Sequence, residues 1–298
     1  MQGGTSEVGP WARQKLDALG KYLHAYTTIL RKQTWLDGYV YVDAFAGPGS
    51  HVIRKNSQES DVQLSMLTDY QAEFDEHREF LNGSPRVALN IQHPFTHYVF
   101  VEQDPQRSGL LQRLQEEYEG RSILIREKDC NEYLRDQLIR NHRLDWSRWR
   151  AVVLLDPFGM QVPWQTIEGL AGLRTVEVII NFPVGMAIQR LLPRSAEIPP
   201  KLRAKLDNYF GTPDWFDIVY RARDGLFGMD YDKIAESGHA LARWYRTTRL
   251  GSVFTYVSSA RLIRNTHGAH LYYLIHAGQN KTGAKIAEDI LAKGEAIS

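Results

Sequence analysis

The sequence contains a single cysteine, Cys130, among 298 residues. One cysteine can form no disulfide within the chain and cannot build a cysteine-based zinc site. The ten histidines include no H-E-x-x-H or similar spacing, so we expect no bound metal. Stability therefore has to come from an ordinary hydrophobic core, for which the chain is long enough.

An excess of one charge sign is also lacking, because 36 basic residues are balanced by 35 acidic ones. This balance argues against a protein that coats nucleic acid or membrane through charge alone, although a local basic patch remains compatible with it. No apolar run is long enough to cross a bilayer, and the N-terminal stretch lacks the apolar core of a signal peptide. These absences favour a soluble, cytoplasmic protein without a membrane partner.

Strand-like and helix-like segments alternate through the middle of the chain. Apolar runs such as VVLL and VEVII are nearly continuous, which is typical of strands buried on both faces, and amphipathic stretches separate them. This alternation predicts an α/β, Rossmann-like fold with a parallel sheet. The predicted organisation is a tail and helix at 1–37, a core at 38–183 with an insertion at about 50–82, a helical insertion or cap at 184–250, and a C-terminal β and helical segment at 251–298 that completes the core.

Each predicted strand ends in an acidic or carboxamide residue. In chain order these residues are Asp43, Glu102, Asp129, Asp156 and Asn181. In doubly wound sheets ligands bind beyond the carboxyl ends of the strands, so we expect these side chains to line one crevice. Asp104 follows Glu102 closely and stands before a proline, so it either joins the crevice or caps the next helix.

The residues at these strand ends suit a nucleoside. Gly47 and Gly49 follow the first strand and leave backbone that a ligand can approach. Glu102 is placed to accept both hydroxyls of a ribose, and Asp129 to meet an exocyclic amine. A G-x-x-x-x-G-K-[ST] loop is missing, and "GPGSHV" lacks the third glycine of G-x-G-x-x-G, so nothing indicates a pyrophosphate.

The stretch "DAFAGPG" (43–49) resembles motif I of class I S-adenosylmethionine-dependent methyltransferases. The resemblance implies that Asp43, Ala46, Gly47 and Gly49 touch the methionine part of S-adenosylmethionine. It also implies that Glu102 holds the ribose and that Asp129 with Cys130 flanks the adenine. In that family an antiparallel hairpin completes the sheet, and the apolar stretches at 252–263 and 269–278 are suited to form it.

A closer resemblance covers nearly the whole chain. The segments "YVDAFAGPG", "GSPRVAL", "FVEQDP", "LLDPFG", "EVIINFPVG" and "YYLIHAGQNKTGAKIAEDIL" occur in the order typical of the three-Cys-motif partner protein family. The resemblance implies a methyltransferase-like domain that works with a separate protein carrying three cysteines, in a phage-defence or mobile-element context. It does not define the substrate.

The segment "DPFG" (156–159) is similar to the [DNS]-P-P-[YFW] motif of methyltransferases that act on base amines. In that motif the first residue holds the amine and the aromatic ring stacks on a flipped base. Here the second proline is missing and the ring comes one position early. We therefore predict acceptor-positioning roles for Asp156 and Phe158, and for Asn181, which precedes another aromatic residue.

Arginines are interleaved with tryptophan and tyrosine at 140–150 and 243–249. Such patches can clamp phosphates and stack bases, which makes nucleic acid a candidate partner; the alternative is a solvated helix face with its aromatics in the core. Two other functions stay open beside a methyltransferase. One is a non-catalytic module that binds a nucleoside and regulates a partner, and the other is a metal-dependent phosphohydrolase or nuclease.

Overall fold

The computed structural model describes residues 10–47, 83–141, 144–225, 228–264, 268 and 270–297. Gly49 and the predicted insertion at about 50–82 lie outside these residues. The chain folds as two compact units, Met1–Cys130 and Asn131–Ser298. The predicted α/β fold with a mostly parallel sheet is confirmed, as are its N-terminal helix and C-terminal antiparallel hairpin.

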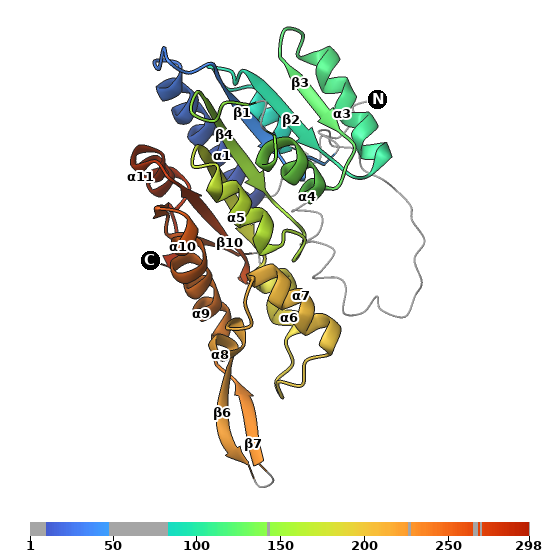
Figure 1. Cartoon of the computed structure of the whole chain (residues 1–298), viewed down its shortest axis with the longest axis vertical. Helices are drawn as coiled ribbons and strands as arrows, with labels where there is room; N and C mark the ends of the chain where they lie inside the picture. Colours follow the sequence, from blue (N-terminus) through green and yellow to red (C-terminus); the bar gives the residue numbers. More distant parts are fainter. Residues whose placement is uncertain are drawn as a thin grey trace. The chain divides into compact units, whose positions relative to one another are not determined.

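The first unit is built around three parallel strands. Its elements are α1 (Pro10–Leu30), β1 (Gly38–Asp43), a helical stretch at 83–89, β2 (His97–Val101), α3 (Pro105–Glu117) and β3 (Ile123–Arg126) (Figure 1). Strand β2 lies between the other two, with Val42 opposite Val99 and Val99 opposite Leu124. Helix α1 buries Leu19, Tyr22 and Leu23, which recur at three- and four-residue steps as an amphipathic helix requires.

The second unit combines parallel and antiparallel strands. Its helical segments are α4 (Cys130–Tyr133, which begins at the unit boundary), η2 (Leu134–Ile139), α5 (Trp164–Gly172), η3 (Val184–Ile188), α6 (Gln189–Leu191), α7 (Pro200–Phe210), α8 (Trp215–Val219), α9 (Ser237–Trp244), η4 (Tyr245–Leu250), α10 (Gly251–Val253) and α11 (Lys281–Ile290). Its strands are β4 (Trp149–Leu155), β5 (Val176–Phe182), β6 (Tyr220–Gly225), β7 (Gly228–Lys233), β8 (Tyr256–Val257), β9 (Ala260–Arg264), β10 (His270–Gly278) and β11 (Ala296–Ile297).

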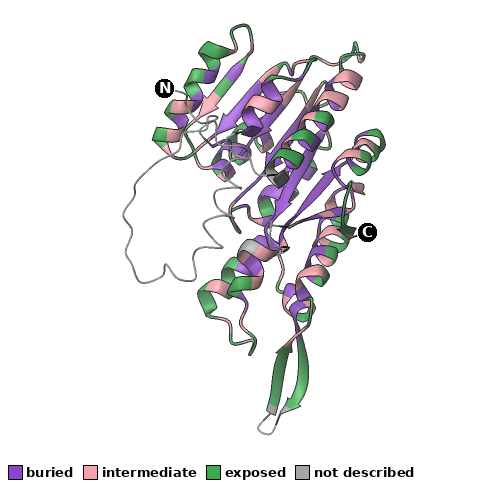
Figure 2. Ribbon diagram, turned by 180° about the vertical axis from the view of Figure 1, so that it is seen from behind, coloured by how far each residue is buried: buried purple, intermediate pink, exposed green. Residues whose placement is uncertain are grey.

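Strands β4 and β5 run parallel, and β10 then pairs antiparallel with β5 and with β9. Every residue of β5 is buried, which explains its nearly continuous apolar sequence (Figure 2). Phe182 at the end of β5 stacks on Tyr245 with ring centroids 4.6 Å apart. On the opposite face of the strand, Glu177 Oε2 lies 3.0 Å from Nε2 of the buried His276 on β10.

The segment at 184–250 is mostly helical, but it also contains a β-hairpin that the sequence did not predict. Strands β6 and β7 pair antiparallel and project beyond the helices of their own unit (Figure 1). The hairpin is largely exposed, so its strands lack the apolar runs on which strand prediction depends (Figure 2). Arg223 on β6 instead forms ion pairs with Asp230 and Asp232 on β7.

None of the helices in the described ranges is long and apolar enough to span a membrane.

Gly185 in η3 allows β10 to pass close to the chain that leaves β5. A Cβ at this position would overlap the backbone carbonyl oxygen of His270. We expect Gly185→Ala to lower the free energy of unfolding by about 3 kcal/mol or to prevent folding, because backbone has to move. Gly172→Ala in the same unit meets no atom within 4 Å and should change stability by less than about 1 kcal/mol. Urea unfolding compares them, and equal stability of the two variants would contradict the close approach.

Candidate functional site

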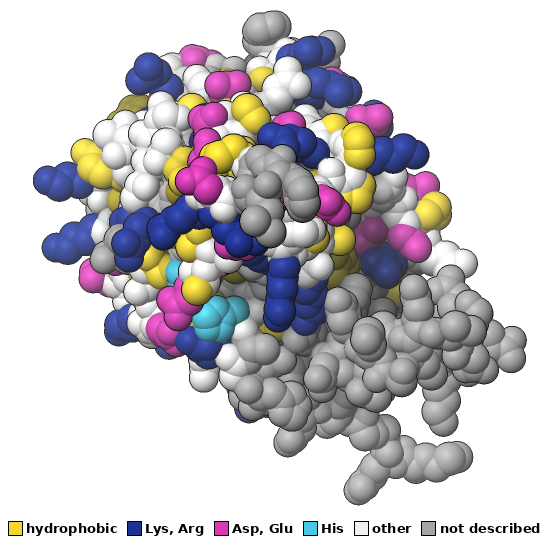
Figure 3. Space-filling view, turned by 90° about the horizontal axis from the view of Figure 1, so that it is seen from below, with side chains coloured by type: hydrophobic (Ala, Val, Ile, Leu, Met, Phe, Trp, Pro, Cys, Tyr) yellow, Lys and Arg dark blue, Asp and Glu magenta, His cyan; other side chains and the backbone are white. Residues whose placement is uncertain are grey.

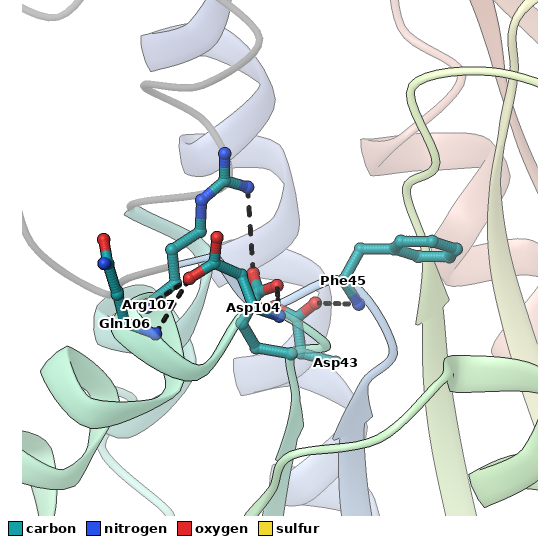
Figure 4. Close-up of polar contacts among 6 residues, drawn as sticks. Asp43, Phe45, Asp104, Gln106 and Arg107 are labelled. Atoms are coloured by element: carbon teal, nitrogen blue, oxygen red, sulfur yellow. Dashed lines mark hydrogen bonds and ion pairs between the residues drawn. The ribbon is translucent and has the colours of Figure 1, made fainter. Parts of the chain in front are cut away.

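The Asp43 carboxylate organises the chain at the end of β1. The side chain is fully buried. Its Oδ1 accepts a hydrogen bond from the Phe45 N–H at 3.2 Å (Figure 4). Its Oδ2 accepts one from the Ser84 hydroxyl at 2.6 Å. The Tyr41 hydroxyl lies 3.5 Å from the same Oδ2. Asp43 therefore ties the turn after β1 to the helical stretch at 83–89.

The turn after β1 presents bare backbone. Ala46 is fully buried, and its N–H donates to the Val101 carbonyl at 3.0 Å, which fixes the turn to the end of β2. Gly47 has φ of +57°, in the left-handed region that side chains disfavour. Glycine at this position therefore meets a backbone requirement.

Glu102 follows β2 and carries a largely buried carboxylate. Its Oε1 accepts a hydrogen bond from the Asp104 N–H at 2.8 Å, and its Oε2 lies 4.0 Å from Nη1 of Arg107 (Figure 4). The side chain is 11% exposed. Burial raises the pKa of Glu102, and the Asp104 N–H and the Arg107 charge oppose that rise only in part. The carboxylate is thus in a place that a hydrogen-bond donor would stabilise further.

Asp104 caps helix α3. Its Oδ1 accepts hydrogen bonds from the Gln106 N–H at 2.8 Å and the Arg107 N–H at 3.0 Å, and Pro105 occupies the first helical position (Figure 4). These contacts favour the capping alternative over a place in the crevice.

The predicted cofactor residues that the structure describes lie at one edge of the first unit. Asp43 ends β1 opposite Phe100, and Glu102 comes one residue after Val101, which pairs with Arg126 of β3. Parallel strands present their carboxyl ends at the same edge, so β1, β2 and β3 deliver their following loops together. The loop after β3 carries the half-buried Asp129, and the buried Cys130 begins α4. Whether these residues bind a cofactor stays a prediction.

The predicted acceptor residues all lie in the second unit. Asp156 directly follows β4, and Asn181 is the penultimate residue of β5; both side chains are buried. Asp156 and Asn181 each come one residue after the last pair of the β4–β5 register, Leu155–Ile180. Phe158 is half-buried in the loop after β4. The aromatic residue after Asn181 is different, since Phe182 points to the opposite face and stacks in the core.

The Arg- and aromatic-rich segment at 243–249 is engaged largely within the second unit. Tyr245 stacks in the core, and its burial raises its pKa. The Arg246 Nε–H donates to the Ser258 carbonyl, and Arg249 lies over the Trp164 ring while its Nε–H donates to the Phe210 carbonyl. Arg243 is exposed. These contacts give most of the segment a structural role.

In the part of the chain that the structure describes, His, Cys, Asp and Glu side chains form no group of three or more that could hold a metal ion.

No protein-family model matches this chain, and no curated protein matches its sequence. The structure is similar to that of a Legionella pneumophila protein, with a TM-score of 0.44 and 11% identity over 95% of each chain. It is also similar to Trm1 from Pyrococcus horikoshii in complex with S-adenosyl-L-methionine, with a TM-score of 0.41 and 12% identity over 98% of this chain and 61% of that one. A third similar structure is the putative methyltransferase yhhF from Escherichia coli, with a TM-score of 0.30 and 12% identity over 79% of this chain and 90% of that one.

Similarities of this strength carry no argument about activity. The resemblance to the three-Cys-motif partner family therefore stays a prediction.

Sequence reasoning did not identify the residues that hold these carboxylates in place. Ser84 bonds Asp43 across 41 positions of the sequence, and Arg107 approaches Glu102 from the first turn of α3. A helix that starts right after a strand-end acid is a signal for the second contact, because its first turn must lie beside that acid. The sequence carries no comparable signal for the first contact.

The cap at the start of α3 leads to a stability prediction. Asp104→Ala leaves two helix N–H groups without their acceptor, so we expect it to lower the free energy of unfolding by about 1 kcal/mol. Asp104→Asn keeps an acceptor oxygen and should stay close to the parent protein. Thermal unfolding followed by circular dichroism measures both, and a wild-type melting curve for the alanine variant would speak against the cap.

Proposed function

We propose that this chain is an S-adenosylmethionine-dependent methyltransferase. The proposal assigns cofactor binding to the first unit, at the carboxyl ends of β1, β2 and β3. It assigns acceptor binding to the second unit, at Asp156 and Phe158. The observation that supports it most is the Glu102 carboxylate, which is nearly buried at the end of the middle strand beside a glycine turn.

The residues at this edge are compatible with an adenosyl compound. A ribose diol offers two O–H donors to the Glu102 carboxylate. Burial raises the pKa of this carboxylate, and the Asp104 N–H and the Arg107 charge oppose that rise only in part. Gly47 leaves room beside the strand end for a ligand to approach the backbone. Asp43 contributes to ligand binding indirectly, because it holds the turn after β1 through hydrogen bonds from the Phe45 N–H and the Ser84 hydroxyl.

When bound, S-adenosylmethionine supplies an electrophilic methyl group on a sulfonium. The protein therefore mainly has to align the acceptor and exclude water. In this proposal Phe158, half-buried in the loop after β4, offers a ring face to a planar acceptor, and Asp156 accepts a hydrogen bond from it.

Nucleic acid is the acceptor class that the charge distribution favours. The first unit has 14 basic and 18 acidic residues, whereas the second has 22 basic and 17 acidic residues. A near-neutral total thus conceals a basic second unit, which is the one that contains Asp156. Its exposed basic side chains include Arg190, Arg194, Lys201, Lys205, Arg221 and Arg243. In Figure 3, Lys and Arg side chains recur across the visible face, with hydrophobic, Asp and Glu side chains between them.

The cofactor assignment is tested at Glu102. We expect S-adenosylmethionine and S-adenosylhomocysteine to bind the full chain in calorimetry, and Glu102→Gln to weaken both at least tenfold, because the ribose loses its charged acceptor. Glu116→Gln removes an exposed carboxylate from the same unit and serves as the matched control. Absence of binding by the parent protein, or equal affinities of the two variants, would contradict the assignment.

Glu102→Gln should weaken cofactor binding without lowering the free energy of unfolding. Burial raises the pKa of Glu102 in the folded protein above its ordinary value of 4.5, so the neutral form favours folding and ionisation opposes it. This contribution is present below the ordinary pKa and is lost as pH rises through the folded pKa. We therefore expect Glu102→Gln to be at least as stable as the parent at pH 7 in urea unfolding. A clearly less stable variant would contradict the direction of the shift.

Cofactor binding should also depend on pH through Glu102. The ionised carboxylate is the better acceptor for ribose hydroxyls, and its raised pKa means that protonation competes above the usual range for glutamate. We expect the Kd for S-adenosylhomocysteine to increase as pH falls toward that pKa, and the Glu102→Gln variant to show a flatter profile. Parallel profiles for the two proteins would assign the pH dependence to another group.

A partner protein with three cysteines, and a role in phage defence, are proposed on the resemblance in sequence alone. Co-purification of a cysteine-containing partner from the source organism tests the first. Transfer of a labelled methyl group to nucleic acid, with and without that partner, distinguishes a methyltransferase from a non-catalytic module that only binds the cofactor.

A further inference from the structure

The side chain of Asn181 is buried without its hydrogen bonds. It is 1% exposed, and neither Oδ1 nor Nδ2 has a hydrogen-bond partner among the described residues. Buried polar groups in folded proteins are nearly always paired, because an unpaired amide loses its bonds to water and gains nothing in exchange. A carboxamide left in this state at the end of a strand is able to accept from and donate to a group outside the described residues.

Asp156 lies beside this carboxamide. Extending the β4–β5 register one residue past its last pair, Leu155–Ile180, brings Asp156 level with Asn181, on strands about 4.8 Å apart. Both side chains are buried. Together they present two kinds of acceptor, a carboxylate and an amide oxygen, and one kind of donor, the amide nitrogen.

Apolar residues surround this polar pair on the same face. Leu274 of β10 is level with Asn181 on the other side, and Ile179 and Leu154 occupy the row below. All three are buried. Such surroundings suit a flat, mostly apolar ligand whose polar edge would meet the polar pair.

We propose that Asn181 and Asp156 together recognise the amidine-type edge, H₂N–C=N, of a nucleobase. One amine hydrogen is donated to the Asp156 carboxylate and the other to Asn181 Oδ1, while Asn181 Nδ2 donates to the ring nitrogen. Adenine, cytosine and guanine have such an edge, whereas uracil and thymine lack the amine. This inference rests on the proposed function and adds the acceptor class to it.

A side-chain amide of a protein substrate also has an amine and an acceptor atom. The second unit has 22 basic and 17 acidic residues and is therefore net positive. This charge favours nucleic acid, which is a polyanion, over a protein as the substrate that carries the edge. In the transfer, the exocyclic nitrogen forms a bond to the methyl carbon. The sulfur–methyl bond breaks with its electron pair on sulfur, and the proton that the nitrogen loses passes to the Asp156 carboxylate.

Asn181→Leu tests this role, because leucine has a similar volume and no polar atoms. We expect the variant to melt at a temperature equal to or higher than the parent, since an unpaired buried amide is removed. Its affinity for S-adenosylmethionine should be unchanged, and its rate of methyl transfer to single-stranded oligonucleotides should fall at least a hundredfold. Asn208→Leu, which changes an exposed asparagine on α7, is the matched control.

Binding supplies a readout that does not depend on transfer. We expect fluorescence anisotropy to show that the parent chain binds oligoadenylate or oligocytidylate at least tenfold more tightly than oligothymidylate, and that Asn181→Leu abolishes this preference. The inference would be overturned if the parent bound the three probes equally or not at all, or if the variant kept the full preference. A lower melting temperature of the variant together with weaker cofactor binding would overturn it as well. An Asn181-dependent preference for amine-bearing probes without any binding of S-adenosylmethionine would instead overturn the proposed function and leave the base site standing.

Discussion

The candidate site depends on how the buried Asp43 carboxylate fixes the chain at the end of β1. Its oxygens accept hydrogen bonds from the turn that follows and from the helical stretch at 83–89. That turn is then held to β2 through Ala46, and Gly47 within it has a left-handed backbone. Without the carboxylate, the buried Ser84 hydroxyl would lose its acceptor and the backbone at the strand end would lose its position.

Three acidic residues at the ends of β1 and β2 have different roles because their surroundings differ. Asp43 has its oxygens engaged within the unit, and Asp104 caps α3. Glu102 is mostly buried, with the Asp104 N–H close by and an arginine at a longer distance, and burial outweighs these contacts and raises its pKa. Glu102 is thus the residue of the three that suits a ligand, because its contacts within the chain compensate for the loss of solvation only in part.

The sequence was sufficient to predict the parallel strands and their ends, because buried parallel strands have apolar runs that stop at a polar residue. Asp43, Glu102 and Asp156 were located this way, and the structure brings the first two to one edge of the first unit. The exposed β6–β7 hairpin has no such apolar runs and was missed. Pairing across the sequence was not predictable, which is why the bond between Ser84 and Asp43 was missed. The different orientations of Asn181 and Phe182 follow from strand geometry, but the unpaired state of the Asn181 amide required coordinates.

The hairpin of β6 and β7 has two open edges, and such edges usually invite pairing with strands of other molecules. Arg223, Asp230 and Asp232 place charges of both signs along it, so a second copy approaching in most registers would meet like charges or bury an ion pair. Met229, 60% exposed next to this charged row, is the apolar surface that these charges have to shield. The charged residues that leave these strands without apolar runs thus also oppose edge-to-edge assembly in concentrated protein.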